Sequence, residues 1–242
     1  MKNNNFSSLQ KNKDMSLNEQ NRIDWVKQTL ESLPKGLRIL DAGAGEQQFK
    51  QYCSHLKYVS QDFAQYDPKQ IKKGLQMPAW DYGKLDIISD INNIPEPNES
   101  FDAILCTEVF EHIPEPIMAI KEFGRLIKKN GTLIITAPFC SMTHFAPYHY
   151  YSGFNRFFYE KHLLENSFEI STIKCNGNYF DYVNQELSRS PYVGEEYSKI
   201  KITKIESLAL KIISKMLLRF SKNDKGSSEL QNFGFHIIAT KK

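Results

Sequence analysis

Short apolar runs alternate with amphipathic stretches along the first half of the chain. The runs predict β-strands, because each is rich in aliphatic residues and is bounded by turn-forming or polar residues. The five predicted strands lie at 37–40, 57–60, 85–88, 101–106 and 132–136. Strands that alternate with helical stretches are typical of βαβ units, so the pattern predicts an α/β fold with a mostly parallel sheet.

Two helices are predicted in this half from the spacing of apolar residues. The first begins at Ser16, which forms a capping-box pattern with Glu19, and it ends at 34–36. The second begins at Pro116 and is expected to end at Asn130-Gly131. Residues 1–15 are polar and rich in Asn and Lys, so we expect a disordered N-terminus.

After the fifth strand the alternation stops. Residues 168–174 and 233–240 predict two further strands, and nearly sixty residues separate them. Within this interval apolar side chains recur every three or four residues from Ile205 to Phe220, which predicts a helix. We therefore expect a single domain over 16–242, with a helical insertion at about 178–232 between its last two strands.

The composition is that of a folded protein with free thiols. Of the 242 residues, 40% are hydrophobic and 12% are aromatic, which argues against disorder. No apolar run approaches the roughly 20 residues that span a bilayer, and the N-terminus lacks the apolar core of a secretory signal. The four cysteines form no CxxC pair, so neither a zinc site nor a disulfide framework is indicated. These features predict a cytoplasmic protein.

The formal net charge of +3 is unevenly distributed along the chain. From Lys199 to the C-terminus there are ten Lys or Arg residues and three Asp or Glu residues. The rest of the chain is mildly acidic, which argues against nucleic-acid binding across the whole surface. The basic stretch at 199–219 also carries an apolar stripe, and four interpretations stay open. The stretch could be a core-packed helix with solvated lysines, cover the active site, form a dimer contact, or lie on an anionic membrane surface.

Acidic residues and glycines follow the first three predicted strands. The carboxyl ends of parallel strands meet at one edge of a sheet, where ligands bind. A turn with two glycines lets the backbone approach a ligand, and an acidic side chain accepts hydrogen bonds from ribose hydroxyls. The residues in these positions are Asp41, Gly43, Gly45, Asp62, Asp90 and Ile91. The pattern indicates a nucleotide-like cofactor.

Five motifs occur in the order expected of a known enzyme family. They are DAGAGE, YVSQD, DIISDINNIP, FDAILCTEVFEHIPEP and GTLIITAPF. Together they resemble the class I S-adenosylmethionine-dependent methyltransferases, type-11 branch, over residues 37–177. The resemblance implies a Rossmann-like sandwich whose mostly parallel, seven-stranded sheet has an antiparallel last strand. It also implies S-adenosylmethionine as the methyl donor.

The resemblance further implies which residues hold the donor. They are Asp41 in the first motif, Gly43 and Gly45 at the methionine portion, Asp62 at the ribose, Asp90 with Ile91 at the adenine, and Cys106 with Thr107 beside the sulfonium. The chain departs from many members of the family at Gln47, where they have another glycine. A dinucleotide needs a GxGxxG turn for its pyrophosphate, so NAD and FAD are disfavoured.

The stretch at 138–151, after the fifth strand, carries the candidate acceptor site. It combines two phenylalanines, three tyrosines and two histidines, which suit a ring-shaped, hydroxylated acceptor. His144 and His149 are candidate bases, because imidazole exchanges a proton near neutral pH. His112, which is expected to lie four residues after Glu108 on a possible helix, is a third catalytic candidate. The HExxH zinc pattern, which has two histidines, is absent here, so no metal site is predicted.

These residues predict O-methylation of a small hydroxylated acceptor such as a sugar or glycan precursor, by analogy with type-11 members of polysaccharide biosynthesis. Two alternatives stay open: N- or C-methylation of a quinone-like or other metabolite, and a catalytically inert, cofactor-binding partner subunit. A nucleic-acid acceptor is disfavoured, because Cys-Thr-Glu-Val-Phe follows the fourth strand in place of an Asn/Asp-Pro-Pro-aromatic turn. The identity of the acceptor and the oligomeric state are left open.

Overall fold

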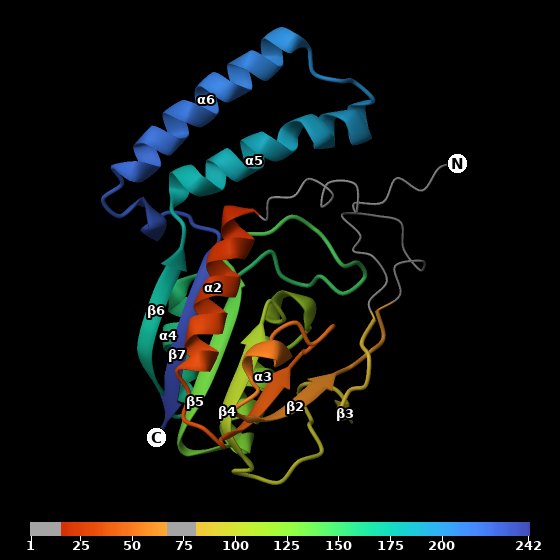
Figure 1. The fold of residues 1–242 in the computed structure, drawn as a ribbon, viewed down its shortest axis with the longest axis vertical. Coiled ribbons are helices and arrows are strands. Elements are labelled where there is room, and N and C mark those ends of the chain that lie inside the picture. The colour runs from red at the N-terminus through yellow and green to blue at the C-terminus, as the bar shows by residue number, and fades with distance from the viewer. Residues whose placement is uncertain (1–15, 67–80) are drawn as a thin grey trace. The chain divides into compact units, whose positions relative to one another are not determined.

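The computed structural model describes residues 16–66 and 81–242, and a seven-stranded sheet runs through it (Figure 1). The strands are β1 (Arg38–Ala42), β2 (Lys57–Asp62), β3 (Ile87–Ile88), β4 (Phe101–Thr107), β5 (Ile127–Pro138), β6 (Phe168–Asn176) and β7 (Gly234–Lys241). Their order in the sheet is β3-β2-β1-β4-β5-β7-β6. The pairs from β3 to β5 are parallel and β7 is antiparallel to β5, which confirms the predicted fold class.

Helix α2 (Leu17–Glu31) covers one face of the sheet (Figure 1). Its Val26 and Leu30 are fully buried in a cluster with Ile39 of β1 and Leu105 of β4. Burial of an aliphatic side chain of this size contributes roughly 1.5–3 kcal/mol, so the cluster fixes α2 on the sheet. The predicted start of the helix is confirmed, because the Ser16 hydroxyl accepts a hydrogen bond from the Glu19 amide at 3.2 Å.

Two further helices pack in the same way, with their apolar side chains towards the interior. They are α3 (Pro116–Leu126) and α4 (Arg156–Glu165), which contact each other. Phe123 of α3 and Tyr159 of α4 are fully buried. The apolar stripe of each helix therefore faces the interior, as a helix that covers a parallel sheet requires.

The predicted end of α3 at Asn130-Gly131 is wrong. The helix ends at Leu126, and Ile127 already pairs with Phe101 as the first residue of β5. Both predicted helix-ending residues lie inside the strand, where its register on β4 shifts. Gly131 is required for this shift, since a Cβ atom there would lie 2.9 Å from the backbone oxygen of Asp102. The Asn-Gly pair thus marks an irregular strand and not a helix terminus.

The structure divides into two compact units: one comprises the described residues up to 174 together with 234–242, and the other comprises residues 175–233. The second unit begins within the end of β6 and reaches to β7, so it contains the interval at 178–232 where an insertion was predicted. Whether residues 16–242 form one domain stays a prediction. The disordered N-terminus predicted for residues 1–15 lies outside the described residues.

The second unit is built on two long helices, α5 (Tyr179–Val193) and α6 (Lys204–Lys222). Each begins with a capping box, at Asn178 and at Thr203. The Asn178 side-chain amide donates to Ser221 Oγ at 3.0 Å, which ties the start of α5 to the end of α6. The two helices therefore run antiparallel as a hairpin.

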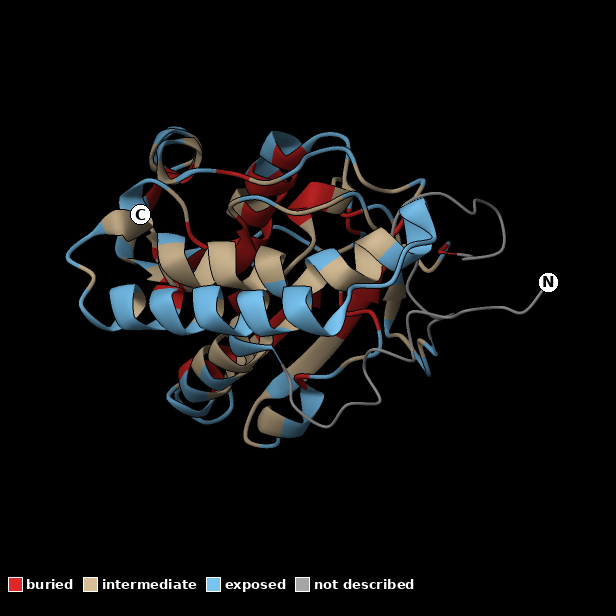
Figure 2. Cartoon of the chain, turned by 90° about the horizontal axis from the view of Figure 1, so that it is seen from above, coloured by how far each residue is buried: buried red, intermediate tan, exposed pale blue. Residues whose placement is uncertain are grey.

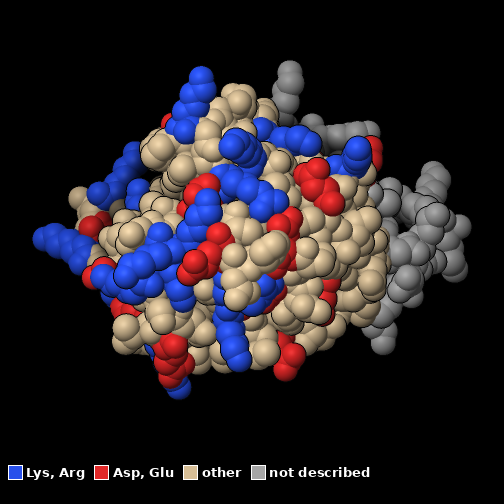
Figure 3. Space-filling view, turned by 90° about the horizontal axis from the view of Figure 1, so that it is seen from below, with Lys and Arg blue, Asp and Glu red and all other residues tan. Residues whose placement is uncertain are grey.

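Charged side chains of both signs are intermingled on the face that Figure 3 shows. Among the described residues, ion pairs such as Arg38–Glu96 at 2.9 Å and Lys128–Asp102 at 2.7 Å also join opposite charges. Such a face lacks the continuous basic field that a phosphate backbone would require. No helix among the described residues is long and apolar enough to cross a membrane.

Candidate functional site

The first predicted donor residues lie where β1 ends. Asp41 is buried, and its Oδ2 accepts a hydrogen bond from the Tyr58 hydroxyl at 2.6 Å. Burial raises the pKa of Asp41 to about 7, against the opposing effect of the Tyr58 hydrogen bond. The negative charge of Asp62 adds to the rise in this pKa. Asp41 is thus a buried polar group beneath the glycine-rich turn, paired to the neighbouring strand β2.

The glycine-rich turn is fastened to the end of β2 by backbone hydrogen bonds. The Gly43 and Ala44 amides both donate to the Gln61 carbonyl at 2.9 Å. Gly43 has a φ of +76°, and a Cβ atom there would lie 2.4 Å from Val109 Cγ2. A glycine is therefore required at this position for the close packing of the turn against the residue that follows β4.

Asp62 closes the same turn from the other side. Its Oδ2 accepts a hydrogen bond from the Gly45 amide at 2.9 Å, and its Oδ1 accepts one from the Ala64 amide at 2.9 Å. Burial raises the pKa of Asp62, and these backbone hydrogen bonds partly oppose that rise. A carboxylate with two oxygens retains further lone pairs, so Asp62 can still accept from a ligand hydroxyl.

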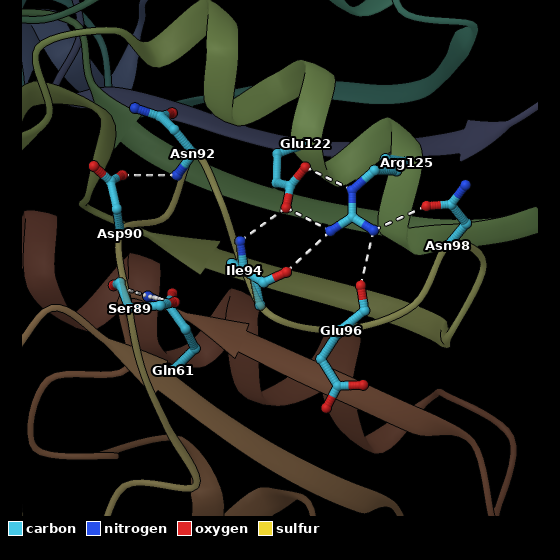
Figure 4. A network of polar contacts seen from close by, with 9 residues as sticks. All are labelled: Gln61, Ser89, Asp90, Asn92, Ile94, Glu96, Asn98, Glu122 and Arg125. Carbon is cyan, nitrogen blue, oxygen red and sulfur yellow. Dashed lines mark hydrogen bonds and ion pairs between the residues drawn. The ribbon is translucent and has the colours of Figure 1, made fainter.

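The third predicted pair lies just after β3 (Figure 4). The Asp90 carboxylate is exposed and accepts a hydrogen bond from the Asn92 amide at 2.8 Å, whereas the Ile91 side chain is buried. Gln61 of β2 donates to the Ser89 carbonyl at 2.7 Å and ties this loop to the turn region. Asp41, Gly43, Gly45, Asp62 and Asp90 thus gather at the carboxyl ends of neighbouring strands β1, β2 and β3.

A partly buried ion pair on α3 supports the loop that carries Asp90 and Ile91 (Figure 4). The Arg125 guanidinium donates to both Glu122 oxygens, to two backbone carbonyls of the loop and to Asn98 Oδ1. Glu122 in turn accepts from the Ile94 amide at 2.8 Å. Burial alone would raise the pKa of Glu122, but the Arg125 hydrogen bonds hold it below its ordinary value.

Cys106 and Thr107, the predicted neighbours of the sulfonium, end strand β4. The Cys106 side chain is fully buried and its burial raises the thiol pKa well above the ordinary value, whereas Thr107 keeps some exposed surface. Glu108 follows in the left-handed region, with a φ of +53°. Its carboxylate accepts from Thr136 Oγ1 at 2.9 Å and pairs with Arg22 of α2 at 3.1 Å.

The expected helical pairing of Glu108 with His112 does not form. Only a short 3-10 helix, Phe110–His112, follows β4, and the left-handed residue at Glu108 precedes it. Glu108 is thereby turned towards α2 and β5, as its contacts with Arg22 and Thr136 show. His112 belongs to a different group of side chains.

All three predicted catalytic histidines lie in one cluster. The ring centroids of His112 and His144 are 4.7 Å apart, and those of His144 and His149 are 4.9 Å apart. His112 and His149 are separated by 6.0 Å. The aromatic stretch after β5 thus folds back onto the segment after β4. A catalytic role for any of the three stays a prediction.

Hydrogen bonds to carbonyl groups define which ring nitrogen carries a proton. His112 Nδ1 lies 2.6 Å from the Tyr148 carbonyl, and His144 Nδ1 lies 2.8 Å from the Met142 carbonyl. A carbonyl oxygen only accepts, so Nδ1 donates in both rings and a neutral ring presents its lone pair at Nε2. Burial lowers the pKa of His112 to about 3, so this ring is neutral.

His149 has the opposite arrangement. Its Nε2 lies 3.2 Å from Ser141 Oγ, whose hydroxyl donates to the Ser152 carbonyl at 3.0 Å. Because that hydroxyl proton is already used, Nε2 donates to Ser141 and the lone pair of a neutral ring is at Nδ1. Burial lowers the pKa of His149, and His144 lowers it further.

The histidine cluster lies beside the residues that follow Asp62. Phe145 stacks on Tyr66 with ring centroids 3.7 Å apart and lies 4.8 Å from His112. Phe63 meets Tyr148 edge to face at 5.0 Å. These contacts join the predicted ribose site to the predicted acceptor stretch, as transfer between two substrates requires.

Glu111 is a site residue to which the sequence assigned no role. Its side chain is buried, with only 1% exposed, and its Oε2 has no hydrogen-bond partner among the described residues. Burial raises its pKa well above the ordinary value, with a further contribution from Glu108. Glu111, His112 and His144 offer possible metal-ligand atoms that all lie within 4.8 Å of one another. The sequence feature that could have pointed to Glu111 is the Glu-His dipeptide that follows a predicted strand.

Comparison with known proteins agrees with this geometry. A family model described as a methyltransferase domain matches residues 15–174. The chain belongs to the class I S-adenosylmethionine-dependent methyltransferases. This family implies S-adenosylmethionine as the methyl donor and a small molecule as the methyl acceptor. The type-11 branch stays a prediction.

Curated relatives match about half of the chain. A ubiquinone biosynthesis O-methyltransferase of Xanthomonas oryzae pv. oryzae is 29% identical over 121 residues, which are 48% of this chain and 48% of the relative. A 2-methyl-6-phytyl-1,4-hydroquinone methyltransferase of Synechocystis is 25% identical over 127 residues, 48% of this chain and 38% of the relative. The chain thus spans about half the length, or less, of the curated relatives it matches.

A solved structure shows the same fold over most of the chain. The 4+2 cyclase SpnF superposes with a TM-score of 0.53 at 16% identity, covering 91% of this chain and 80% of that one. At this level of identity the likeness concerns the fold alone. The function of the methyltransferase must therefore be argued from its own residues.

We predict that Arg125→Ala destabilises the methyltransferase by roughly 2–3 kcal/mol, because it leaves the buried Glu122 carboxylate and two loop carbonyls without their charged donor. Urea unfolding monitored by circular dichroism measures the change. The matched control is Lys128→Ala, which breaks the more exposed Lys128–Asp102 pair and should cost less than about 1 kcal/mol. Equal losses in the two variants would contradict a supporting role for Arg125.

Proposed function

We propose that this enzyme methylates an oxygen of a small phenolic acceptor of the hydroquinone or catechol type. The observation that carries this proposal is the cluster of His112, His144 and His149 on an aromatic stretch that contacts the residues after Asp62. The names of the curated relatives, which refer to ubiquinone biosynthesis and to a hydroquinone, support the same acceptor class. The sugar or glycan precursor expected from the sequence has no such support.

The donor site is assigned to the carboxyl ends of β1, β2 and β3. In this proposal Asp62 accepts hydrogen bonds from the ribose hydroxyls, and the Asp90 carboxylate with the Ile91 side chain binds adenine. The turn at Gly43 and Gly45 takes the methionine portion. Asp41 supports that turn from below, and Cys106 with Thr107 forms the wall beside the sulfonium. The shared position of these residues at adjacent strand ends supports the assignment.

The chemistry requires little beyond alignment and proton removal. The acceptor oxygen forms a bond to the methyl carbon while the sulfur–carbon bond breaks, and the sulfonium becomes a neutral thioether. The acceptor's hydroxyl proton must pass to a base. We assign this role to His149, because Ser141 orients its ring and leaves Nδ1 as the acceptor of the proton.

A phenol suits this site better than a sugar does. A phenolic hydroxyl has a pKa near 10, as tyrosine has, whereas an alcohol hydroxyl is a far weaker acid. A neutral imidazole can therefore deprotonate a phenol during attack with a much smaller free-energy cost. The rings of Phe63 and Tyr148, which are only partly buried, provide aromatic surface on which an aromatic acceptor can pack. Methylation at a ring carbon is the second candidate, since one relative acts on a hydroquinone.

We further propose that α6 contacts an anionic membrane surface. Its apolar side chains at 205, 208, 212 and 216 recur at helical spacing and are all exposed (Figure 2). Lys204, Lys211, Lys215 and Arg219 lie on the same helix, whose sole buried residue is Leu217. A basic helix with an exposed apolar face binds at a lipid interface. Acceptors with an isoprenoid tail, as the phytyl group of one relative's substrate name indicates, reside in such membranes.

We expect S-adenosylhomocysteine at about 100 times its Kd to stabilise the wild type by roughly 2.7 kcal/mol, and Asp62→Ala to lose most of that gain. The variant should gain less stability because it lacks the carboxylate that is proposed to bind the ribose. Thermal unfolding with and without the ligand measures both. Asp24→Ala, at an exposed position of α2, is the control and should keep the full gain. An undiminished gain in Asp62→Ala would remove this residue from the donor site.

His149→Ala should lower turnover of a hydroquinone or catechol acceptor by about 100-fold or more, because the general base is lost. The stabilisation by S-adenosylhomocysteine should not change. Product formation is measured by mass spectrometry, with monosaccharides as competing acceptors and His162→Ala as the control outside the cluster. Methylation of a sugar but of no phenol would refute the proposed acceptor class, and full turnover by His149→Ala would refute the base.

Lys211→Glu/Lys215→Glu should weaken binding to vesicles of phosphatidylglycerol and phosphatidylcholine at least tenfold, at about 1 kcal/mol for each basic residue near the surface. Vesicle sedimentation measures the bound fraction. Lys35→Glu/Lys57→Glu changes the net charge equally at exposed positions outside α6 and is the matched control. Equal binding by the two double variants would contradict a specific role for α6.

A further inference from the structure

We propose that Glu111, His112 and His144 bind a divalent first-row transition-metal cation. The proposal departs from the sequence-based expectation that the chain holds no metal. The argument that a metal binds here depends only on these three side chains. Only the use of the metal, described below, rests on the proposed methylation of a phenol.

The spacing of the ligand atoms suits a metal ion. Glu111 Oε1 lies 3.6 Å from His112 Nε2. Two ligand atoms at about 2.1 Å from a tetrahedral metal are roughly 3.4 Å apart, so this pair is close to the required distance. The ligand atoms of Glu111, His112 and His144 all lie within 4.8 Å of one another, so the third ligand needs only a small side-chain adjustment.

The hydrogen bonds of His112 leave two electron-rich atoms facing each other. Its Nδ1 donates to the Tyr148 carbonyl, so the Nε2 lone pair points towards the Glu111 carboxylate. A lone pair and an ionised carboxylate oxygen repel unless a cation, either a proton or a metal ion, lies between them. The distance of 3.6 Å is too long for a shared proton in a normal hydrogen bond. A metal ion resolves this conflict.

His144 has the same supporting contact. Its Nδ1 donates to the Met142 carbonyl at 2.8 Å, which directs the other ring nitrogen to the cluster. Histidines that bind metals almost always donate their second ring nitrogen to a carbonyl or carboxylate, which fixes the tautomer and the ring orientation. Both imidazoles of the proposed site therefore have the supporting bond of a metal ligand.

Glu111 supplies the independent observation that points to a ligand. Its carboxyl group is 1% exposed, and Oε2 has no hydrogen-bond partner among the described residues. An ionised carboxylate in such a position costs several kcal/mol unless it is paired or coordinates a metal, and without such a partner it takes up a proton. Arg22 pairs directly with Glu108 at 3.1 Å, whereas the ion-pair contact of Glu111 among the described residues is with His112.

The donor set indicates the class of metal. Two imidazole nitrogens and one carboxylate suit Zn²⁺, Fe²⁺, Co²⁺ or Mn²⁺, whereas Ca²⁺ and Mg²⁺ prefer oxygen ligands. Three protein ligands leave a coordination position for the acceptor oxygen. Coordination lowers the pKa of a bound hydroxyl, so the phenolic proton passes to His149 more readily while the oxygen attacks the methyl group. The metal undergoes no redox change.

Binding of Co²⁺ to the untagged, chelator-treated enzyme tests the proposal without any acceptor. Wild type should bind about one equivalent, with a visible absorption band, and should retain one Zn²⁺ equivalent after dialysis. Glu111→Gln and His144→Ala should each weaken binding at least tenfold, in line with the loss of one ligand. His162→Ala removes an imidazole from the His162–Glu165 pair, which has the same residue types at 3.0 Å, and should bind metal as wild type does.

Two measurements separate this proposal from the proposed function. Circular dichroism and the S-adenosylhomocysteine-induced stabilisation establish that each variant is folded and retains its donor site. His144→Ala keeps the test decisive if Glu111→Gln fails to fold, since His144 lies on the stretch after β5 and is only partly buried. Metal binding by wild type with no methylation of any phenol would refute the acceptor class but leave the site intact. Unchanged metal binding in Glu111→Gln and His144→Ala, or none in wild type, would overturn the site.

Discussion

Three carboxyl groups are buried where β1, β2 and β4 end, and the site depends on how each is compensated. Asp41 accepts a hydrogen bond from the Tyr58 hydroxyl, and Asp62 accepts two from backbone amides of the adjoining turns. Glu111 has no partner for one of its oxygens among the described residues. Because an uncompensated buried charge is costly, these groups determine which turns can form around them. They also mark the positions where a bound ligand or cation could supply the missing hydrogen bond or opposite charge.

The parallel pairing of β1 with β2 and β4 explains why these groups are close together. Each strand ends at the same edge of the sheet, and each is followed by a turn that must change direction sharply. Gly43 meets this demand with a positive φ and a close contact with Val109, and Glu108 meets it in the left-handed region. The glycine-rich turn and the segment after β4 are consequently packed closely against each other. A substitution that moves one of these segments would therefore displace the other.

The positions of the strand ends were predictable from the sequence. The close approach of the candidate acceptor-site histidines to one another was not. Asp62 and Asp90 follow apolar runs, and a parallel sheet brings such positions together without further information. His112 and His144 lie in separate segments, and their meeting depends on the path of the loop that returns after β5. Glu108 was expected to share a helix with His112, because residues four apart suggest one. The left-handed backbone at Glu108 prevents a helix from including both residues, and no sequence pattern predicts this conformation.

The reactivity of the methyl donor explains why so few groups are needed for catalysis. A sulfonium is already an activated electrophile, so the remaining barrier comes from alignment, exclusion of water and removal of the acceptor's proton. Neutral imidazoles held by backbone carbonyls can take a proton or bind a metal, but one ring nitrogen cannot do both. His112 and His144 present Nε2 towards Glu111, whereas the bond from His149 to Ser141 leaves Nδ1. This difference in tautomer, set by three local hydrogen bonds, is what would divide the histidine cluster into the proposed metal-binding pair and the proposed base.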